Sequence, residues 1–548
     1  TGFVSDFVVI AILRTNSELI KEICAQSLFN LLHHEQFRGE MVEIGVLWAL
    51  MKLSKMESKQ TQNICAKVLF NFSCYPGMQE KILEHGVPRL LQIATEKKAE
   101  LVDNQTKQFC AGALCNLAYS KESGSLYAKG GAIGFMKELM DVEDDDNERY
   151  CATIFYNLSH CDIDARVTLV QEGAVPLLIN LAKSKKEKTI IASLSSIYNL
   201  SMCMGARGEM VRDNIAPAIV ATLASTSNLK LIELGLAALY HLTCTRSGHN
   251  GRSCIQLVQT GIVPSVVSLC KRFGAVSTFV TKLCSRIVLN LARQTVTHDR
   301  LVKDNALECL EFFSGCVGKS GLDEAEICKN AIRTFALLCN SPNILGRLIE
   351  FDMFDVYCEA MLRSDGSYNG ENDRNTPKSK SINNKQSLNN HHENDNDNDG
   401  KNLIVEDNNN GNNSGGGDHA LNGNDNDKNK GKNDDSVDDD TVDDTDAAHY
   451  EEDSDLLLLS QVYLNLSFVS SAVKKLVLKN YFDEMLNKLA EKGEELKANC
   501  VKIVKNLLEN EHSKVEMLDT SCAGILSRIS RSTEDETVVS MCGSILNS

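Results

Sequence analysis

Several patterns that would point to other fold classes are missing from this sequence. Its longest apolar run, residues 7–13, ends at Arg14. That run is well short of the ~18 residues that a membrane span needs, so no span is predicted there. No segment alternates apolar and polar residues for long enough to predict a β-sheet. The chain has 43% hydrophobic residues, only 7 prolines and 1 tryptophan. The missing alternation, together with the helical spacing described below, predicts an all-α chain.

The motifs of metal sites and of enzymes are also missing. The chain has 20 cysteines but no Cys-x-x-Cys pair, and no Cys/His spacing typical of a zinc ribbon or finger. No local Ser/His/Asp or Cys/His signature is present, and the segment 318–320 lacks the earlier glycine of a phosphate loop. We therefore expect no metal, no cofactor and no enzymatic activity.

Basic residues are outnumbered, but the imbalance is local. The formal net charge is −17, and of the 74 acidic and 57 basic residues, 24 and 9 lie between Arg363 and Asp455. The rest of the chain is therefore nearly neutral. A nucleic-acid-binding body normally carries clustered Lys and Arg and has a high pI, so we expect no nucleic-acid partner.

The sequence does contain a repeat. An asparagine recurs between apolar residues, usually Leu, Phe, Ile or Val two positions before it and Leu or Phe one position after it. Such offsets place one apolar stripe on each helix, and a fixed period of roughly 20–50 residues is typical of a solenoid. The anchor positions are Asn30, Asn71, Asn116, Asn157, Asn199, Asn290, Asn465, Asn506 and Asn547, with His241 and Ala336 in the same slot.

A corner with Gly or Asn and then Pro precedes the repeated helix at 84–88, 172–176, 214–217 and 261–264. Gly or Asn can end one helix in a left-handed conformation, and proline suits the first position of the next helix. Each repeat is thus predicted to have a short first helix, this corner, a second helix such as 176–183, and a long third helix such as 187–202.

The phrases Cys65 to Ser73 and Ile197 to Ser201, together with the Gly-x-Val-Pro corner, resemble armadillo repeats, the family of beta-catenin, importin-alpha and vacuolar armadillo proteins. The resemblance implies a right-handed α-α superhelix with three helices per repeat of about 41–45 residues. HEAT repeats have a similar length, but they usually lack the separate first helix and the Asn row, so they rank second.

An insertion at 362–454 separates the array of residues 1–361 from that of residues 455–548. It contains 21 Asn between Arg363 and Asp453, and a composition so poor in apolar residues buries too little surface to order a chain. We expect it to be disordered, either a spacer or a regulatory segment, with the superhelix continuing across it. Because the chain starts at Thr1 and ends at Ser548, one residue after the anchor Asn547, we expect a fragment whose last repeat is truncated.

The cysteines follow the repeat. Six of them stand six residues before an anchor, on the side of the leucine stripe, which predicts buried thiols: Cys24, Cys65, Cys110, Cys151, Cys284 and Cys500. So many unpaired thiols favour a reducing compartment, so we expect a cytoplasmic protein, with the nucleus as a second option. The Asn-x-Ser sequons at four anchors recur with the helix pattern and do not predict glycosylation.

The anchor row is the one feature with a functional interpretation. An amide offers two donors and an acceptor, which suits the backbone of an extended peptide. The resemblance implies that third helices line a concave groove. The candidate groove residues are Asn30, Asn71, Asn116, Asn157, Asn199, His241, Asn290, Asn465 and Asn506, together with Lys67, Arg286 and Lys502 four residues before an anchor. The alternative is that each Asn caps or bridges neighbouring helices within the stack.

We therefore expect a monomeric scaffold that binds a protein or peptide segment. Importin-alpha-like proteins place Trp four residues before the Asn, but here that slot holds no Trp, which weakens the alternative of a nuclear import adaptor. The only tryptophan, Trp48, is expected in the core of a second helix. A subunit of a ubiquitin ligase is the other alternative, and no residue here shows the domain it would need. The partner and its pathway stay open.

Overall fold

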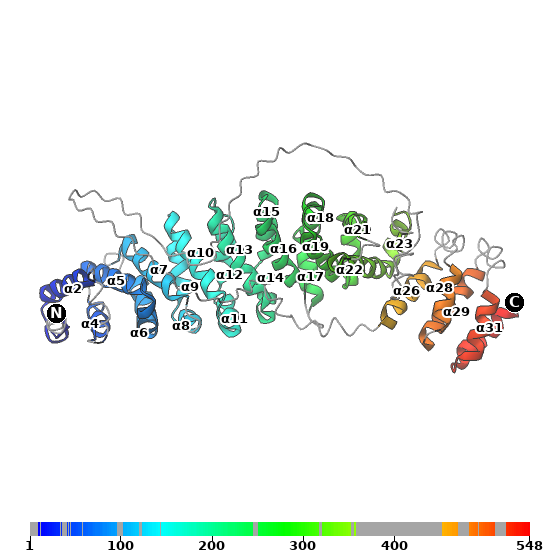
Figure 1. The fold of residues 1–548 in the computed structure, drawn as a ribbon, viewed down its shortest axis with the longest axis horizontal. Coiled ribbons are helices and arrows are strands. Elements are labelled where there is room, and N and C mark those ends of the chain that lie inside the picture. Colours follow the sequence, from blue (N-terminus) through cyan, green and yellow to red (C-terminus); the bar gives the residue numbers. More distant parts are fainter. Residues whose placement is uncertain are drawn as a thin grey trace, which may run out of the picture. The chain divides into compact units, whose positions relative to one another are not determined.

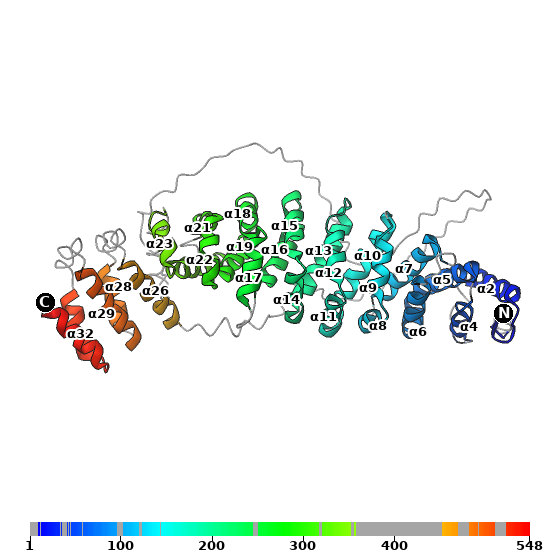
Figure 2. The ribbon, with the colours of Figure 1, turned by 180° about the vertical axis from the view of Figure 1, so that it is seen from behind.

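The computed structural model describes residues 9–351, 356–357, 452–468, 482–509 and 522–547, with short gaps in the first and fourth ranges, the longest at 35–40, 96–101 and 245–249. Within these ranges every regular element is a helix, which confirms the predicted all-α class. The helices follow one another along the array in chain order (Figure 1). The same order is seen from behind in Figure 2.

The third helices carry the anchor positions. Each of them packs against the third helix of the preceding repeat. They are α2 (Glu18–Leu32), α5 (Lys59–Ser73), α7 (Asn104–Leu117), α10 (Asp145–Leu158), α13 (Glu187–Met202), α16 (Leu229–Thr243), α19 (Thr278–Ala292), α22 (Leu322–Cys339), α26 (Glu452–Leu466), α29 (Glu494–Glu509) and α32 (Glu536–Leu546). The predicted third helix at 187–202 is confirmed at both ends.

Local sequence explains where these helices form. At most anchors the apolar residues two before and one after are buried, as with Ile197 and Leu200 in α13, so a repeated stripe faces the core. Many of the helices begin at a polar N-cap whose side chain accepts a backbone N–H of the first turn. These caps are Ser58, Asp103, Asp144, Asn228, Ser277 and Asp535.

The second helices are α4 (Val46–Leu53), α9 (Ala132–Met140), α12 (Ala174–Leu181), α15 (Ile215–Ser225), α18 (Ile262–Phe273), α21 (Ala306–Ser314), α28 (Phe482–Glu491) and α31 (Cys522–Ser532). The predicted corners at Gly173, Asn214 and Gly261 are confirmed, with φ of 96°, 65° and 84°. The prolines stand at the third helical position rather than the first. Proline is tolerated there because the first four N–H groups of a helix have no intrahelical partner.

The first helices are α8 (Ser123–Lys129), α11 (Ile163–Gln171), α14 (Met204–Arg212), α17 (Asn250–Gln259), α20 (His298–Lys303), which follows the short η1 (Thr295–Thr297), and α23 (Pro342–Ile349). The predicted corner at 84–88 is wrong, because α6 (Pro76–Ala94) runs through Pro88 as one helix. Leu83, Val87 and Leu91 are all buried and, at spacings of four residues, continue one helical stripe across the proline. Packing of this stripe outweighs the local cost of proline.

The array continues from one side of the insertion to the other. Helices of both sides belong to one compact unit, and α26 packs directly against α22. The first helix described after the insertion is α26, which carries the anchor Asn465. The expected disorder concerns residues 362–454, nearly all of which lie outside the described residues, so it stays a prediction, as do the domain boundaries at 361 and 455.

The predicted burial of the cysteines six residues before an anchor is confirmed for five of the six, whereas Cys24 is half-buried. Cys65 and Cys151 donate to the carbonyls of Leu50 and Met136 in the second helix of the same repeat, at 3.9 and 3.7 Å. Burial raises the pKa of the Cys65 thiol to about 12. All cysteines that the structure describes are free thiols.

The expectation for Trp48 is wrong, because its side chain is 61% exposed. In α4 the buried stripe consists of Val46, Ala49, Leu50 and Leu53, spaced as one helical face, and Trp48 lies off that face. None of the described helices has by itself both the length and the hydropathy of a membrane span. One bent pair, residues 252–259 and 262–273, reaches them only across a 61° break.

Candidate binding face along the third helices

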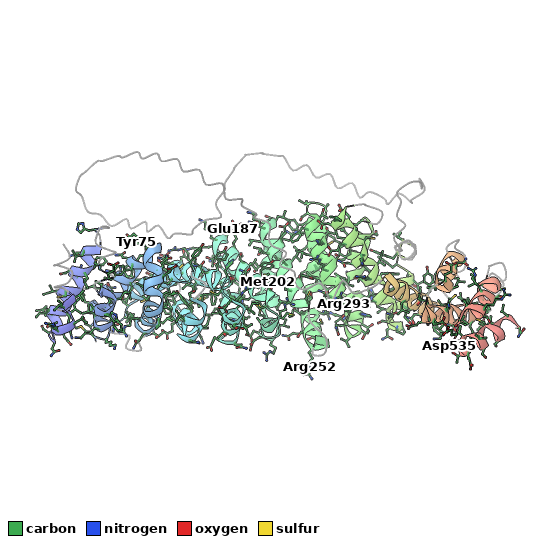
Figure 3. All side chains as sticks on the ribbon, turned by 60° about the horizontal axis from the view of Figure 1, so that its bottom comes forward. Tyr75, Glu187, Met202, Arg252, Arg293 and Asp535 are labelled. Carbon is green, nitrogen blue, oxygen red and sulfur yellow. The ribbon has the colours of Figure 1, made fainter. Side chains whose placement is uncertain are left out.

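One face of the third helices follows from helical spacing. Residues at offsets −4, −1, 0 and +3 from an anchor lie on the same side of a helix, and we call this set of positions the anchor face. Glu187 and Met202 mark the two ends of α13 in Figure 3, and Met202 and Arg293 occupy the +3 positions of two anchors. Because third helices pack in succession, the anchor faces of consecutive repeats adjoin.

Most anchor amides bond to the preceding repeat. Their Nδ2 groups donate to a hydroxyl that stands two residues after the preceding anchor. The pairs are Asn116 to Ser73 at 3.0 Å, Asn199 to Ser159 at 2.9 Å, Asn290 to Thr243 at 3.2 Å and Asn506 to Ser467 at 2.9 Å. Each hydroxyl in turn donates to the carbonyl one residue before its own anchor, as Ser159 does to Tyr156 at 2.7 Å. Two bonds in series thus link neighbouring third helices.

Where the preceding repeat has no hydroxyl, the amide finds another acceptor. Position 118 is Ala, and Asn157 donates instead to the carbonyl of Cys115 at 3.1 Å. Position 338 is Leu, and Asn465 donates to the Oδ1 of Asn340 at 2.9 Å. These bonds support the alternative in which the Asn row bridges neighbouring helices. The serine of the repeated Asn-x-Ser phrase supplies the acceptor for the anchor amide of the next repeat at Ser73, Ser159 and Ser467.

A ligand role for the same amides stays a prediction, and the geometry leaves room for it. The bridging Nδ2 groups of Asn116 and Asn199 also lie 3.5 Å from the Sγ of Cys74 and 3.3 Å from the Nε2 of His160. No bond is seen to the Oδ1 atoms of the half-buried Asn116, Asn157 and Asn199 among the residues described. Asn30 is exposed and accepts a bond from Gln26 of its own helix at 3.1 Å. Asn71 is half-buried.

His241 breaks the amide row. Its side chain is buried among the rings of Tyr198 and Tyr240, with centroids 5.6 and 5.3 Å away, and its Nδ1 has no hydrogen-bond partner within the described part of the chain. Burial, together with the nearby charges of Arg207 and Arg286, lowers the pKa of His241 to about 4. The imidazole is therefore neutral at physiological pH. Ala336, the other exception, is buried and apolar.

The three basic candidates differ in their surroundings. Lys67 is half-buried, with its Nζ 5.2 Å from the centroid of the Phe109 ring in the next repeat. Arg286 forms an ion pair with Glu326 of the next repeat at 2.5 Å and lies over the ring of Tyr240 at 5.3 Å. Burial opposes ionisation of Glu326, yet Arg286 and Lys282 hold its pKa below the usual value. Lys502 is exposed on α29.

Sequence reasoning missed a row of aromatic residues on the anchor face. Tyr156, Tyr198 and Tyr240 stand at the −1 position of three consecutive anchors, and their side chains are partly or largely accessible. Tyr119, at a +3 position, is 76% exposed. The exposed His160 packs edge-on against Tyr156, with ring centroids 4.7 Å apart. The shared offset from the anchors was the signal that could have revealed this row.

Sequence reasoning also missed two arginines of the first helices that donate hydrogen bonds to carbonyls at the C-terminal ends of third helices. Arg207 of α14 is buried and donates to the carbonyls of Ser201, Met202 and Cys244 at 2.7, 3.1 and 2.8 Å. Arg166 occupies a similar place in α11, donating to Cys161 and Asn199 carbonyls. Because the last four carbonyls of a helix have no intrahelical donor, these guanidinium groups complete the C-terminal ends of two successive third helices.

Metal ligation receives no support from the described residues, since they contain no group of three His, Cys, Asp or Glu placed to hold an ion. The geometry instead presents a long face of amides, tyrosines and small residues. Side chains of these kinds can form hydrogen bonds and apolar contacts.

Residues 162–202, which span α11 to α13, match the model of the armadillo/beta-catenin-like repeat. An engineered protein of known structure is 15% identical, with 92% of this chain and 98% of that chain covered and a TM-score of 0.49. A structure from a study of the phosphorylation switch between cadherin and beta-catenin is 12% identical, with 98% and 99% covered and a TM-score of 0.49.

A designed armadillo repeat protein in complex with the peptide (KR)4 is 17% identical, with 46% of this chain and 99% of that chain covered and a TM-score of 0.37. No curated protein matches the chain.

Proposed function

Because this chain is an array of armadillo repeats, we propose that it is a protein–protein interaction scaffold that binds an extended or helical segment of a partner along the anchor face. The observation that carries this proposal is the succession of third helices, each packed on the one before. Along it, the half-buried Asn116, Asn157 and Asn199 each present a side-chain carbonyl oxygen to which no bond is seen among the residues described. Such a row suits a long, regular peptide backbone.

The same proposal includes the finer properties of the scaffold. It acts without a cofactor and without enzymatic activity, as a monomer, and it does not bind nucleic acid. The near neutrality of the chain outside the insertion supports the last point. The free thiols of the described cysteines support a reducing compartment, the cytoplasm with the nucleus as a second option.

A test places large charged side chains on the anchor face without touching the amides. Ser195 and Ala237 stand at −4 positions of α13 and α16 and are half-buried, so the double variant S195R/A237R should block the face. Asn180, exposed on the second helix α12, offers the matched control N180R. Partner segments would first be identified by affinity purification and mass spectrometry, and their affinity then measured by calorimetry.

We expect S195R/A237R to weaken binding by at least tenfold while the melting temperature stays within a few degrees of the parent. N180R should leave the affinity unchanged. Loss of binding with N180R together with normal binding by S195R/A237R would place the partner on the second-helix side and refute the proposal.

A further inference from the structure

The anchor face is uncharged over four consecutive repeats. In the repeats anchored at 116, 157, 199 and 241, none of the sixteen −4, −1, 0 and +3 positions holds Asp, Glu, Lys or Arg. His160 and His241 are the only titratable bases among them, and His241 is neutral because its pKa is lowered. We call this part of the anchor face, on α7, α10, α13 and α16, the neutral segment. A charged partner side chain placed there would lose water without gaining a counter-ion.

Basic residues border the neutral segment on both sides. Lys67 of α5 precedes it, and its Nζ lies over an aromatic ring. Arg286 and Arg293 of the α19 repeat follow it. Arg286 is already paired with Glu326, whereas the exposed Arg293 makes one long bond of 3.4 Å to the Oδ1 of Asn290. Charge complementarity thus favours a ligand with a neutral centre and an acidic group at each end.

Tyrosine rings are the largest groups that the neutral segment presents. Tyr156, Tyr198 and Tyr240 recur once per repeat, and the −4 positions beside them hold only small residues. Gly112 is the smallest, and a Cβ there would meet the Phe70 ring at 2.7 Å. Tyrosine combines a flat apolar surface with a hydroxyl donor. Surfaces lined by aromatic residues are a recurring way to bind the polyproline II conformation.

The spacing of the array also suits that conformation. Packed helices lie about 8–10 Å apart, and three residues of a polyproline II helix rise about 9 Å. One residue in three of such a ligand can therefore meet a tyrosine in every repeat. Its carbonyls, which have no internal hydrogen bonds, can accept from the hydroxyls of the exposed Tyr119 and Tyr156.

We propose that the neutral segment binds an uncharged, proline-containing partner segment in the polyproline II conformation, flanked on both sides by acidic residues. This inference rests on the proposed function, because it names the ligand class of the same face. The tyrosines contact the apolar rings of the ligand. Lys67 and Arg293 meet its acidic ends.

The test uses three synthetic peptides and the whole chain. The first has proline at every third position and a glutamate at each end, EPLAPLAPLAPE. The second has the same residues with the prolines adjacent, and the third has lysine in place of both glutamates. We expect the first peptide to bind at least tenfold more tightly than the second. It should also bind about fivefold more tightly than the third. The difference from the third should shrink at high salt, because exposed charges are screened.

Variants assign the contacts. Y119S/Y156S removes two exposed rings and should weaken the first peptide by at least tenfold. F468S is the matched control, because Phe468 is 70% exposed at the same +3 offset in a repeat outside the neutral segment, and it should have no effect. K67E/R293E should reverse the preference, so that the lysine-flanked peptide binds more tightly. Thermal melting of each variant checks that the fold is intact.

Equal binding of the first two peptides, or no response to K67E/R293E, would overturn the inference. The proposed function would survive that result if a natural partner segment still bound the anchor face and was blocked by S195R/A237R. It would fail with the inference only if no partner responded to S195R/A237R either.

Discussion

The triple substitution N116A/N157A/N199A tests the bridging bonds most directly. It removes the amides at three successive interfaces, α5–α7, α7–α10 and α10–α13, where the donor–acceptor distances are 3.0, 3.1 and 2.9 Å. A typical intramolecular hydrogen bond contributes about 0.5–1.5 kcal/mol. Since the stability of a repeat array is close to a sum of repeat and interface contributions, the free energy of unfolding should fall by about 1.5–4.5 kcal/mol.

Hydrogen exchange is the suitable assay, because it reports opening at individual interfaces. Each interface loses one bond, and a loss of about 0.5–1.5 kcal/mol corresponds to roughly 2- to 12-fold faster exchange there, at about 1.4 kcal/mol per factor of ten. The increase should be confined to α5, α7, α10 and α13, with α19 and α22 unchanged. The control N180A removes an exposed amide of α12 and should change exchange nowhere.

The result that would refute this reasoning is unchanged exchange and unchanged unfolding free energy in the triple variant. If that variant nevertheless bound a partner segment 10- to 1000-fold more weakly, the amides would act on the ligand alone. A decrease in both stability and affinity would mean that each amide has two roles, with its Nδ2 bonding the neighbouring helix and its Oδ1 bonding the ligand.

Three further outcomes are expected. Burial beside Arg207 and Arg286 lowers the pKa of His241 to about 4, so the unfolded chain binds the extra proton first as the pH falls below about 6.5. Neutral His241 therefore contributes up to about 3 kcal/mol to the free energy of unfolding above that pH, and this contribution is lost as the pH falls toward 4. In urea unfolding, H241N should make the free energy of unfolding depend less on pH in this range. R207M deprives three carbonyls of a charged donor and should lower the free energy of unfolding by at least about 3 kcal/mol, as measured with denaturant. R207K should restore part of this loss. Full stability of R207M would contradict the role of Arg207 at these helix ends. A thiol reagent should label the exposed Cys74 of the native protein long before the buried Cys65 and Cys110, as peptide mass spectrometry would show; equal rates would contradict the burial.

Local patterns in the sequence were enough to predict much of the fold. The helix at 187–202 and the corners at Gly173, Asn214 and Gly261 lie where spacing and turn chemistry placed them. The corner at 84–88 and the burial of Trp48 were predicted in the same way and are wrong. In both cases the contacts of a whole helical face outweighed a local preference.

The bonds of the candidate site were harder to predict. The sequence placed the anchor amides beside the apolar stripe, and both a groove role and a bridging role were consistent with that position. The structure shows that Asn199 meets Ser159, a residue of the preceding repeat, and that Tyr156, Tyr198 and Tyr240 share one offset on the same face. No local pattern states which residue of another repeat an amide will meet.

The sequence alone thus determined the repeat, the helices within it and the side of each helix that is buried, because these depend on residues within a few turns of one another. Only the tertiary structure decided the partners of the anchor row. Those partners lie about one repeat away, as with the 42 residues between Asn157 and Cys115. Their pairing depends on how closely two helices pack and on whether the earlier one ends with a hydroxyl, as at Ser159, or with a methyl group, as at Ala118.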